Sequence, residues 1–336
     1  MKVASAALAA CITLLSNGVS ATPMVLAYYS DYPNNYASLL KSASDLSAVS
    51  VDFYNIDANG VVTGNGAAAP DDAIAFLRSR KIPTYGCVSN VDQDWSPSIG
   101  HSVTTRNLDA AVANLVAFAK TNQFAGINID FEALDQGDRN NFSNFVQVLG
   151  RALHAQGLKL IVSVPAFSSV DASNIHNYGY DLHALGANVD YLQLMTYDET
   201  IPGWDPGPVA GSDWMENDLD YASSEVAPGK LLSGLPAYGY DWQANDSGSQ
   251  LFWTNTETLI HQYGVKPQYD KNSNSVTFTY TATDGSGLHT VWTENAKSIA
   301  LKAGLVNAYG LGGVSMYALG MENSDFWRAV KSGLAQ

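Results

Sequence analysis

Residues 124–132 read FAGINIDFE, and this segment predicts both a structural element and a site. The odd-numbered side chains from 127 to 131 are apolar, whereas Asn128, Asp130 and Glu132 are polar. Alternation with period two is typical of a β-strand, in which successive side chains point to opposite faces. Carboxylates two residues apart on a strand lie roughly 7 Å apart along it, so the two acids share one environment.

Two interpretations of this polar face are open. A half-exposed strand whose polar face is simply solvated would need no function. Residues 110–120 and 139–156 have helix-like patterns, however, and a strand between helices belongs to an α/β unit whose strand faces are both covered. Carboxylates that point into such an interior cost folding free energy. We therefore expect the acidic row to form a functional site.

Strand-like and helix-like segments alternate along most of the chain. Candidate strands cover residues 25–29, 49–54, 82–88, 126–131, 158–164, 191–196, 231–235 and 312–316. Candidate helices cover residues 36–43, 71–80, 108–120, 140–156, 182–185, 213–223, 295–309 and 325–334. Eight such pairs predict a closed (β/α)8 TIM barrel. A doubly wound open sheet is the runner-up, but no glycine-rich phosphate loop follows the first strand.

One segment after the seventh strand interrupts the alternation. Residues 275–281 (SVTFTYT) and 288–292 flank a DGSG turn and predict a β-hairpin, and residues 254–263 have a helical pattern. We assign residues 240–293 to a small α+β insertion. Residues 22–239 and 294–336 then form the catalytic barrel.

The N-terminal residues 1–21 have the pattern of a secretory signal peptide. A charged start is followed by a short apolar core and a small-residue cleavage site after Ala21. The apolar core is shorter than the roughly 20 residues that a membrane span needs, so we expect no membrane span. Residues 8–11 (LAAC) also resemble a bacterial lipidation box, which makes lipid anchoring at Cys11 the second interpretation. We predict a secreted protein, extracellular or periplasmic.

The charge balance excludes some partners. Without Lys2 of the signal segment, 16 basic residues stand against 32 acidic ones, a net charge of −16. Such a chain is a poor partner for nucleic acid or anionic lipid.

Removal of the signal segment with Cys11 leaves Cys87 as the remaining cysteine, so no intrachain disulfide is expected. The strand-like surroundings of Cys87 predict a buried, unreactive thiol. We expect a monomer.

Active sites of this barrel class lie at the C-terminal ends of the strands. Glu132 lies just past the end of the fourth candidate strand, and Asp130 lies one inward step below it. Other strand ends carry further polar or aromatic residues: Tyr28, Ser89, Asn90, Tyr197, Asp198, Tyr238 and Tyr317.

Three tryptophans fall in the segments after the third, sixth and seventh strands. Aromatic planes beside carboxylates suit stacking on the apolar faces of sugar rings. We expect this role for Trp204 and Trp242, and for Trp95 both stacking and core packing stay open.

Other catalytic chemistries find no support in the sequence. The six histidines show no metal-ligand spacing such as H-x-x-x-H, and no G-x-S-x-G segment marks a serine hydrolase. We therefore expect acid–base chemistry by carboxylates, with no metal and no cofactor.

Four segments resemble one known family in order and position. Residues 125–132 (AGINIDFE) resemble the D-G-x-D-x-D-x-E signature of glycoside hydrolase family 18, the chitinase family. Residues 192–198 (LQLMTYD) resemble its M-x-Y-D element, residues 230–242 (KLLSGLPAYGYDW) its seventh-strand segment, and residues 310–320 (GLGGVSMYALG) its final strand. The resemblance spans roughly residues 24–330.

The resemblance implies a retaining glycosidase that uses its substrate as the nucleophile. The substrate would be a polysaccharide that contains N-acetylglucosamine: chitin, chitooligosaccharides or peptidoglycan. Glu132 would protonate the leaving glycosidic oxygen and then activate water, while the substrate's own 2-acetamido oxygen attacks. Asp130 would orient that amide and Tyr197 would hydrogen-bond its oxygen. Together with the strand-end and loop residues above, the residues expected to contact substrate are Asn128, Gln193, Met195, Asp198, Tyr28, Tyr238, Trp204, Trp242 and Tyr317. Independently of the resemblance, an acid at Glu132 requires a raised pKa, which a neighbouring carboxylate in a partly dry barrel mouth supplies.

The chain departs from the family pattern at several positions. Ala125 and Asn128 stand where the family usually has Asp, Tyr317 stands where a Trp usually floors the sugar subsite, and the third strand lacks S-x-G-G. We hypothesise that Asn128 makes Asp130 less prone to share a proton and so shifts the pH–activity curve. The sequences of residues 126–132 and 311–319 resemble those of the bacterial peptidoglycan-processing and spore-cortex branch of the family.

A non-catalytic, lectin-like carbohydrate-binding relative of the same fold is the alternative function. Such relatives often lose the acid, whereas this chain keeps Glu132, Asp130 and Tyr197. Chitin, peptidoglycan and N-linked glycan are not separated by the sequence.

Overall fold

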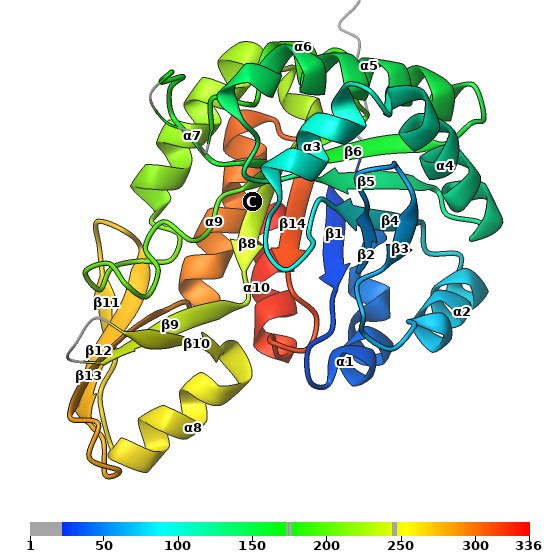
Figure 1. Cartoon of the computed structure of the whole chain (residues 1–336). Coiled ribbons are helices and arrows are strands. Elements are labelled where there is room, and N and C mark those ends of the chain that lie inside the picture. Colours follow the sequence, from blue (N-terminus) through cyan, green and yellow to red (C-terminus); the bar gives the residue numbers. More distant parts are fainter. Residues whose placement is uncertain (1–21, 173, 175–176, 244–246) are drawn as a thin grey trace, which may run out of the picture.

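The computed structural model describes residues 22–172, 174, 177–243 and 247–336 (Figure 1). The predicted signal at 1–21, with its candidate lipidation site Cys11, lies outside the described residues. Within the part of the chain that is described, every helix is too short or too polar to cross a bilayer.

Eight parallel strands close into a barrel, which confirms the predicted (β/α)8 fold and excludes the open sheet. Closure is seen at β1, which pairs in parallel with both β14 and β2. The barrel strands are β1 (Met24–Tyr29), β2 (Ala48–Ile56), β4 (Thr84–Ser89), β5 (Gly126–Asp130), β6 (Lys159–Pro165), β7 (Tyr191–Met195), β8 (Leu231–Pro236) and β14 (Gly313–Tyr317). A short strand, β3 (Val62–Gly64), adds to β2 in antiparallel fashion.

Helices surround the barrel, as Figure 1 shows. They are α1 (Asn35–Ser42), α2 (Asp71–Arg80), α3 (Pro97–Thr104), α4 (Leu108–Thr121), α5 (Arg139–His154), α6 (Leu182–Gly186), α7 (Ser212–Glu225), α9 (Ala296–Tyr309) and α10 (Ser324–Leu334). Helix α3, which the sequence pattern did not predict, is short and begins where Ser96 caps the Ile99 amide.

The two faces of β5 separate as the alternation predicts. Ile127, Ile129 and Phe131 are fully buried, and the Phe131 ring stacks on Phe142 and Phe145 of α5 with centroids 6.1 and 5.6 Å apart. Helix α5 buries one side because its apolar residues recur every three or four positions, which is the spacing of one helical face. The apolar side of β5 is therefore fixed against α5, and its polar side faces the barrel interior.

The insertion forms a second sheet between β8 and α9. Its five antiparallel strands have the order β10-β9-β13-β12-β11, and helix α8 (Trp253–Tyr263) follows β10. The predicted hairpin is β12 (Ser275–Thr281) with β13 (Leu288–Thr293). Strands β9 (Tyr238–Gln243), β10 (Gly248–Phe252) and β11 (Gln268–Asp270) were not predicted, because short strands that pair only within an insertion have little pattern of their own. Figure 1 shows the insertion beside the barrel, with its sheet formed by β9–β13.

A buried ion pair joins this insertion to the barrel. Lys302 of α9 is fully buried, and its Nζ lies 2.5 Å from Glu294 Oε1. The same ammonium donates to Ser275 Oγ of β12 at 3.0 Å, and that hydroxyl donates to Glu294 at 3.0 Å. Because the three groups come from α9, β12 and the segment between β13 and α9, they fix the insertion to the barrel wall.

Candidate active site

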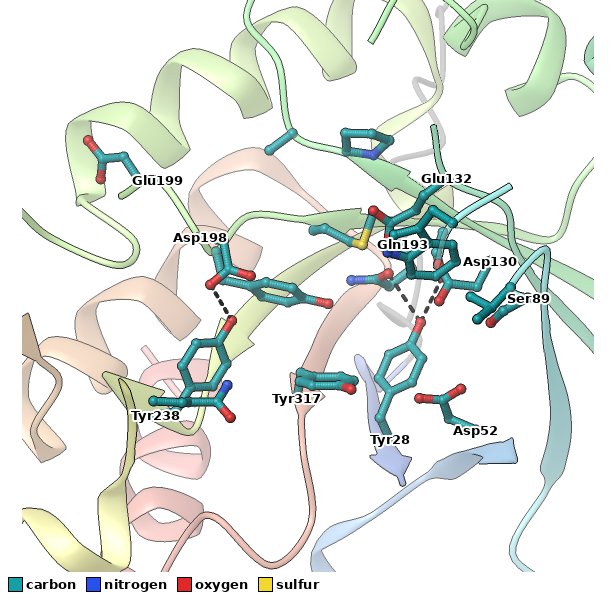
Figure 2. Close-up of a pocket in the computed structure, with 18 of the residues that line it drawn as sticks. Tyr28, Asp52, Ser89, Asp130, Glu132, Gln193, Asp198, Glu199, Tyr238 and Tyr317 are labelled. Atoms are coloured by element: carbon teal, nitrogen blue, oxygen red, sulfur yellow. Dashed lines mark hydrogen bonds between the residues drawn. The ribbon is translucent and has the colours of Figure 1, made fainter. Parts of the chain in front are cut away.

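A cavity of about 980 Å³ opens at the C-terminal ends of the barrel strands. Figure 2 shows the acidic pair, Asp130 and Glu132, on one side of the cavity. Asp198 and Tyr238 lie on the other side, and Tyr317 lies between the two sides. Six carboxyl groups and no lysine, arginine or histidine are among the described residues that line it: Asp52, Asp92, Asp130, Glu132, Asp198 and Glu199. The structure thus brings the acids together in a site with negative potential.

Asp130 and Glu132 lie where the strand pattern predicts. Asp130 is the last residue of β5, Glu132 follows two residues later, and both line the cavity. Burial, together with the charges of Asp198 and Asp52, raises the pKa of Glu132 to about 7. Burial also raises the pKa of Asp130 well above its ordinary value, and the charges of Glu132 and Asp52 add to that effect. With both pKa values raised, the pair retains a proton near neutral pH, as an acid catalyst requires.

One oxygen of Asp130 is left without a protein partner. Its Oδ1 is buried, and no hydrogen bond from the described residues reaches it. Buried carboxylate oxygens are nearly always paired, so an exception at a cavity needs an explanation. A donor on a bound ligand would satisfy it.

Asn128 lies beneath the cavity rather than in its lining. It is fully buried, and its amide nitrogen donates to Tyr28 Oη at 2.8 Å and to Ser50 Oγ at 3.0 Å. Ser163 Oγ donates to its carbonyl oxygen at 3.2 Å. The expectation of substrate contact at Asn128 is therefore wrong, because its hydrogen-bonding atoms are committed to other barrel strands.

Tyr28 and Gln193 connect this polar layer to the cavity. Tyr28 Oη lies 2.9 Å from Ser163 Oγ and donates to Gln193 Oε1 at 3.1 Å, while Gln193 Nε2 donates to Ser315 Oγ at 3.0 Å. Both Tyr28 and Gln193 line the cavity, as does Met195 of β7. Hydrogen bonds across β1, β6, β7 and β14 hold this floor rigid.

The opposite wall carries the residues expected from the sixth and seventh strands. Tyr197, Asp198 and Tyr238 all line the cavity. Asp198 Oδ1 accepts a hydrogen bond from Tyr238 Oη at 2.7 Å (Figure 2). It also accepts one from Tyr240 Oη at 2.8 Å. Gly234 of β8 makes room for Tyr197, because a Cβ there would lie 2.8 Å from the tyrosine ring.

Tyr317 lies at the centre of an aromatic group in the cavity. Its ring centroid is 5.6 Å from that of Tyr28 and 6.1 Å from that of Tyr197. Its hydroxyl lies 3.4 Å from that of Tyr32, and the peptide bond that follows it is cis. A phenol therefore occupies the position at which the resemblance implied an indole.

The tryptophans differ from one another in exposure. Trp204 is 59% exposed and lines the cavity, and Trp95 and Trp214 line it as well. Trp242 does not: it lies on β9 between β10 and β13 and is fully buried, with its centroid 5.6 Å from that of Tyr240. The expectation of sugar stacking at Trp242 is wrong, because the insertion sheet covers a residue that the sequence placed in an open loop.

Three lining acids, Asp52, Asp92 and Glu199, were not predicted. Asp52 of β2 accepts a hydrogen bond from Ser30 Oγ at 2.9 Å, and burial raises its pKa. A signal was present, because Ser50 and Asp52 alternate with apolar residues of β2 just as Asn128 and Asp130 do on β5. Glu199 follows Asp198 and accepts the Gly211 amide at 2.6 Å.

Within the described residues, the cavity included, no group of three or more His, Cys, Asp or Glu is arranged to hold a metal ion. Cys87 is fully buried, and its sulfur lies 3.6 Å from the amide nitrogen of Asn128.

Comparison with known proteins agrees with this geometry. The family model "Glycosyl hydrolases family 18" matches residues 24–322. A crystal structure of a chitinase from Chromobacterium violaceum is 65% identical, with a TM-score of 0.91, over 94% of this chain and 99% of that one. A class V chitinase structure from Pseudomonas fluorescens is 36% identical, with a TM-score of 0.87, over 93% of this chain and 99% of that one.

A curated relative matches over almost the same length. The uncharacterized glycosylase YvbX of Bacillus subtilis is 33% identical, over 98% of this chain and 97% of that protein. The spore cortex-lytic enzyme SleL of Bacillus cereus, at 20% identity and a TM-score of 0.86, shares the fold.

Proposed function

The chain belongs to glycosyl hydrolases family 18, and we propose that it cleaves β-1,4 bonds next to N-acetylglucosamine with the substrate's own 2-acetamido group as the nucleophile. As a member of that family it is a glycoside hydrolase. The chitinase from Chromobacterium violaceum, whose length it covers almost fully, supports a chitin-type substrate.

The observation that carries the mechanism is the pairing of a protonated acid with an unpartnered acceptor. Glu132, with its pKa raised to about 7, can give its proton to the glycosidic oxygen as the bond from that oxygen to C1 breaks. The buried Oδ1 of Asp130, which lacks a partner in the described protein, can accept the N–H of the substrate's acetamido group. That hydrogen bond would turn the acetamido oxygen toward C1.

The remaining steps follow from the same two carboxyl groups. Attack by the acetamido oxygen on C1 closes a positively charged oxazolinium ring, which the Asp130 carboxylate stabilises. The Glu132 carboxylate, now deprotonated, takes a proton from water as the water oxygen attacks C1 and reopens the ring. Two displacements at C1 retain the β configuration, and Tyr197, which lines the opposite wall of the cavity, would hydrogen-bond the acetamido oxygen.

The charge of the cavity bears on the substrate class. Six carboxyl groups and no cationic side chain in the described lining favour an uncharged glycan such as chitin or its oligomers. Peptidoglycan carries carboxylates on the stem peptides of its muramic acid residues and would be repelled. We propose secretion as the route to such a substrate, on the pattern of residues 1–21. The lectin-like alternative is not favoured, because the acid and its partner are both in place.

The test uses three glycans and two product readouts. Purified protein is incubated with chitin hexamer, peptidoglycan and cellulose hexamer, which lacks acetamido groups, and the new reducing end is observed by NMR. We expect cleavage of the chitin hexamer with the β anomer formed first, no cleavage of the cellulose hexamer, and none of any glycan by Glu132→Gln. Initial release of the α anomer, or cleavage of cellulose, would contradict the substrate-assisted mechanism.

A further inference from the structure

We propose that Asn90 is a positioning residue, whose side-chain amide fixes the backbone of Glu132 and so aims the catalytic carboxyl into the cavity. The proposal rests on the role of Glu132 given above. Asn90 is fully buried and does not line the cavity, so its action is indirect.

The sheet does not hold Glu132 by itself. The ladder between β4 and β5 ends at the pair Ser89 and Asp130, so the backbone of Glu132 lies beyond the last strand pairing. The residue after it, Ala133, has a positive φ of 52°, at which the chain turns sharply away. A left-handed conformation costs a non-glycine residue about 1 kcal/mol or more, so surrounding contacts must hold it.

The side chain of Asn90 takes the place of the missing strand neighbour. Its Oδ1 accepts the Glu132 N–H at 2.8 Å, and its Nδ2 donates to the Glu132 carbonyl oxygen at 2.8 Å. A carboxamide carries one acceptor and a donor pair, so one side chain can satisfy both backbone groups of a single residue. These two hydrogen bonds extend the β4–β5 ladder beyond its last pair, Ser89 and Asp130, to Glu132.

The main chain of Asn90 is engaged elsewhere. Its carbonyl oxygen accepts the Ser96 N–H at 2.9 Å, and its Nδ2 also donates to the Ser96 carbonyl oxygen at 3.0 Å. The loop between these residues carries Trp95, which lines the cavity. Asn90 thereby ties the acid to the cap of α3 and to the cavity rim.

A second buried group holds the preceding peptide. Tyr180 is 1% exposed, and its hydroxyl donates to the Phe131 carbonyl oxygen at 2.6 Å. Glu132 is thus fixed through its own peptide groups by Asn90 and through its neighbour by Tyr180. Misplacement of a catalytic group by about 1 Å can cost about 10²-fold in rate, so the geometry gives this fixation a catalytic effect.

Three variants test the proposal on the full chain with chitin hexamer. Asn90→Ala removes all these side-chain bonds, whereas Asn90→Asp keeps the size and the acceptor but removes the donor. The control Asn107→Ala removes a bond of the same kind, from Asn107 Nδ2 to the Ala58 carbonyl oxygen at 2.7 Å, and neither of these residues lines the cavity. The concentration of binding-competent sites is measured by calorimetry with a sulfur-linked, non-hydrolysable N-acetylglucosamine trimer, so loss of folded protein does not count as loss of kcat.

We expect kcat per binding-competent site to fall about 10- to 100-fold in both Asn90 variants, with KM within about threefold of wild type and the control unchanged. Wild-type kcat per site in either Asn90 variant would overturn the proposal.

A second readout does not depend on activity. The pKa of the Glu132 carboxyl, followed by carbon NMR, should fall in Asn90→Ala from about 7 toward its ordinary 4.5, because a released side chain reaches water. If wild type cleaves no glycan, the proposed function fails. An unchanged pKa of Glu132 in Asn90→Ala would then still overturn the positioning role of Asn90, and a lowered pKa would support it.

Discussion

Asn128 and Tyr28, which lie 100 residues apart in the chain, meet inside the barrel, where the asparagine amide donates to the tyrosine oxygen at 2.8 Å. Tyr28 in turn contacts Ser163 and Gln193, so the amide at 128 anchors a hydrogen-bonded layer directly below the acidic pair. A carboxylate at this position could not donate to Tyr28 or Ser50. These hydrogen bonds are a structural reason for an amide at 128, in addition to the electrostatic hypothesis that an uncharged residue there makes Asp130 less prone to share a proton.

Asn128→Asp should therefore change both stability and pH dependence. A carboxyl group buried at 128 has a raised pKa in the folded state, so its ionisation opposes folding, and the loss of stability should be small near pH 4 and grow to about 2–4 kcal/mol at neutral pH. Its negative charge raises the pKa values of Asp130 and Glu132, so the basic limb of kcat should move to higher pH. Urea unfolding and kcat between pH 4 and 9 check both, and an unmoved limb would refute the electrostatic part.

Glu132→Gln should stabilise the protein at alkaline pH while it abolishes activity. The folded-state pKa of Glu132 is raised from 4.5 to about 7, so the proton-linked stability is present below pH 4.5 and is lost as the pH rises through about 7. Glutamine does not titrate and avoids that loss. We expect the variant to equal wild type near pH 4 and to exceed it by about 1–3 kcal/mol at pH 8. Thermal unfolding across this range measures the difference, and parallel curves would mean that the pKa of Glu132 is not raised.

Trp204→Ala and Trp242→Ala should have opposite effects. Trp204 is 59% exposed at the cavity, so its loss should raise KM about 2- to 10-fold with little change in Tm, as expected for one lost stacking contact. Trp242 is fully buried in the insertion, so its loss should cost about 3–5 kcal/mol and leave KM unchanged in the folded fraction. Each variant is the control for the other. A Trp242→Ala protein with normal Tm and raised KM would contradict the burial.

The Lys302–Glu294 pair should be needed for docking of the insertion. Lys302→Met leaves the buried Glu294 carboxylate without its cation, which should cost about 3–5 kcal/mol in urea unfolding. The double variant Lys302→Met/Glu294→Leu removes both charges and should recover much of that loss. If the double variant is as unstable as the single one, the pair stabilises by packing rather than by charge compensation.

The eight strands and helices could be predicted from the sequence because their patterns are local. Period-two alternation and helical spacing depend only on neighbouring residues, and each predicted bound of a barrel element lies within two residues of the observed one. The acidic pair was found in the same way, since Asp130 ends the strand and Glu132 continues its alternation two residues later. Asp52 carried the same alternation on β2, but a single acid without a partner in its own strand gave no reason to select it.

The amino-acid sequence by itself determined which strand carries the acids and which face they occupy, because backbone geometry sets the direction of successive side chains. Tertiary structure alone decided which other groups meet them. Whether a tryptophan lies at the rim, like Trp204, or inside a sheet, like Trp242, depends on strands that pair from distant parts of the chain. The same holds for Asn90, whose side chain meets the backbone of Glu132 across 42 positions of sequence. Such contacts form only when separate strands pair, and no local pattern of residues encodes them.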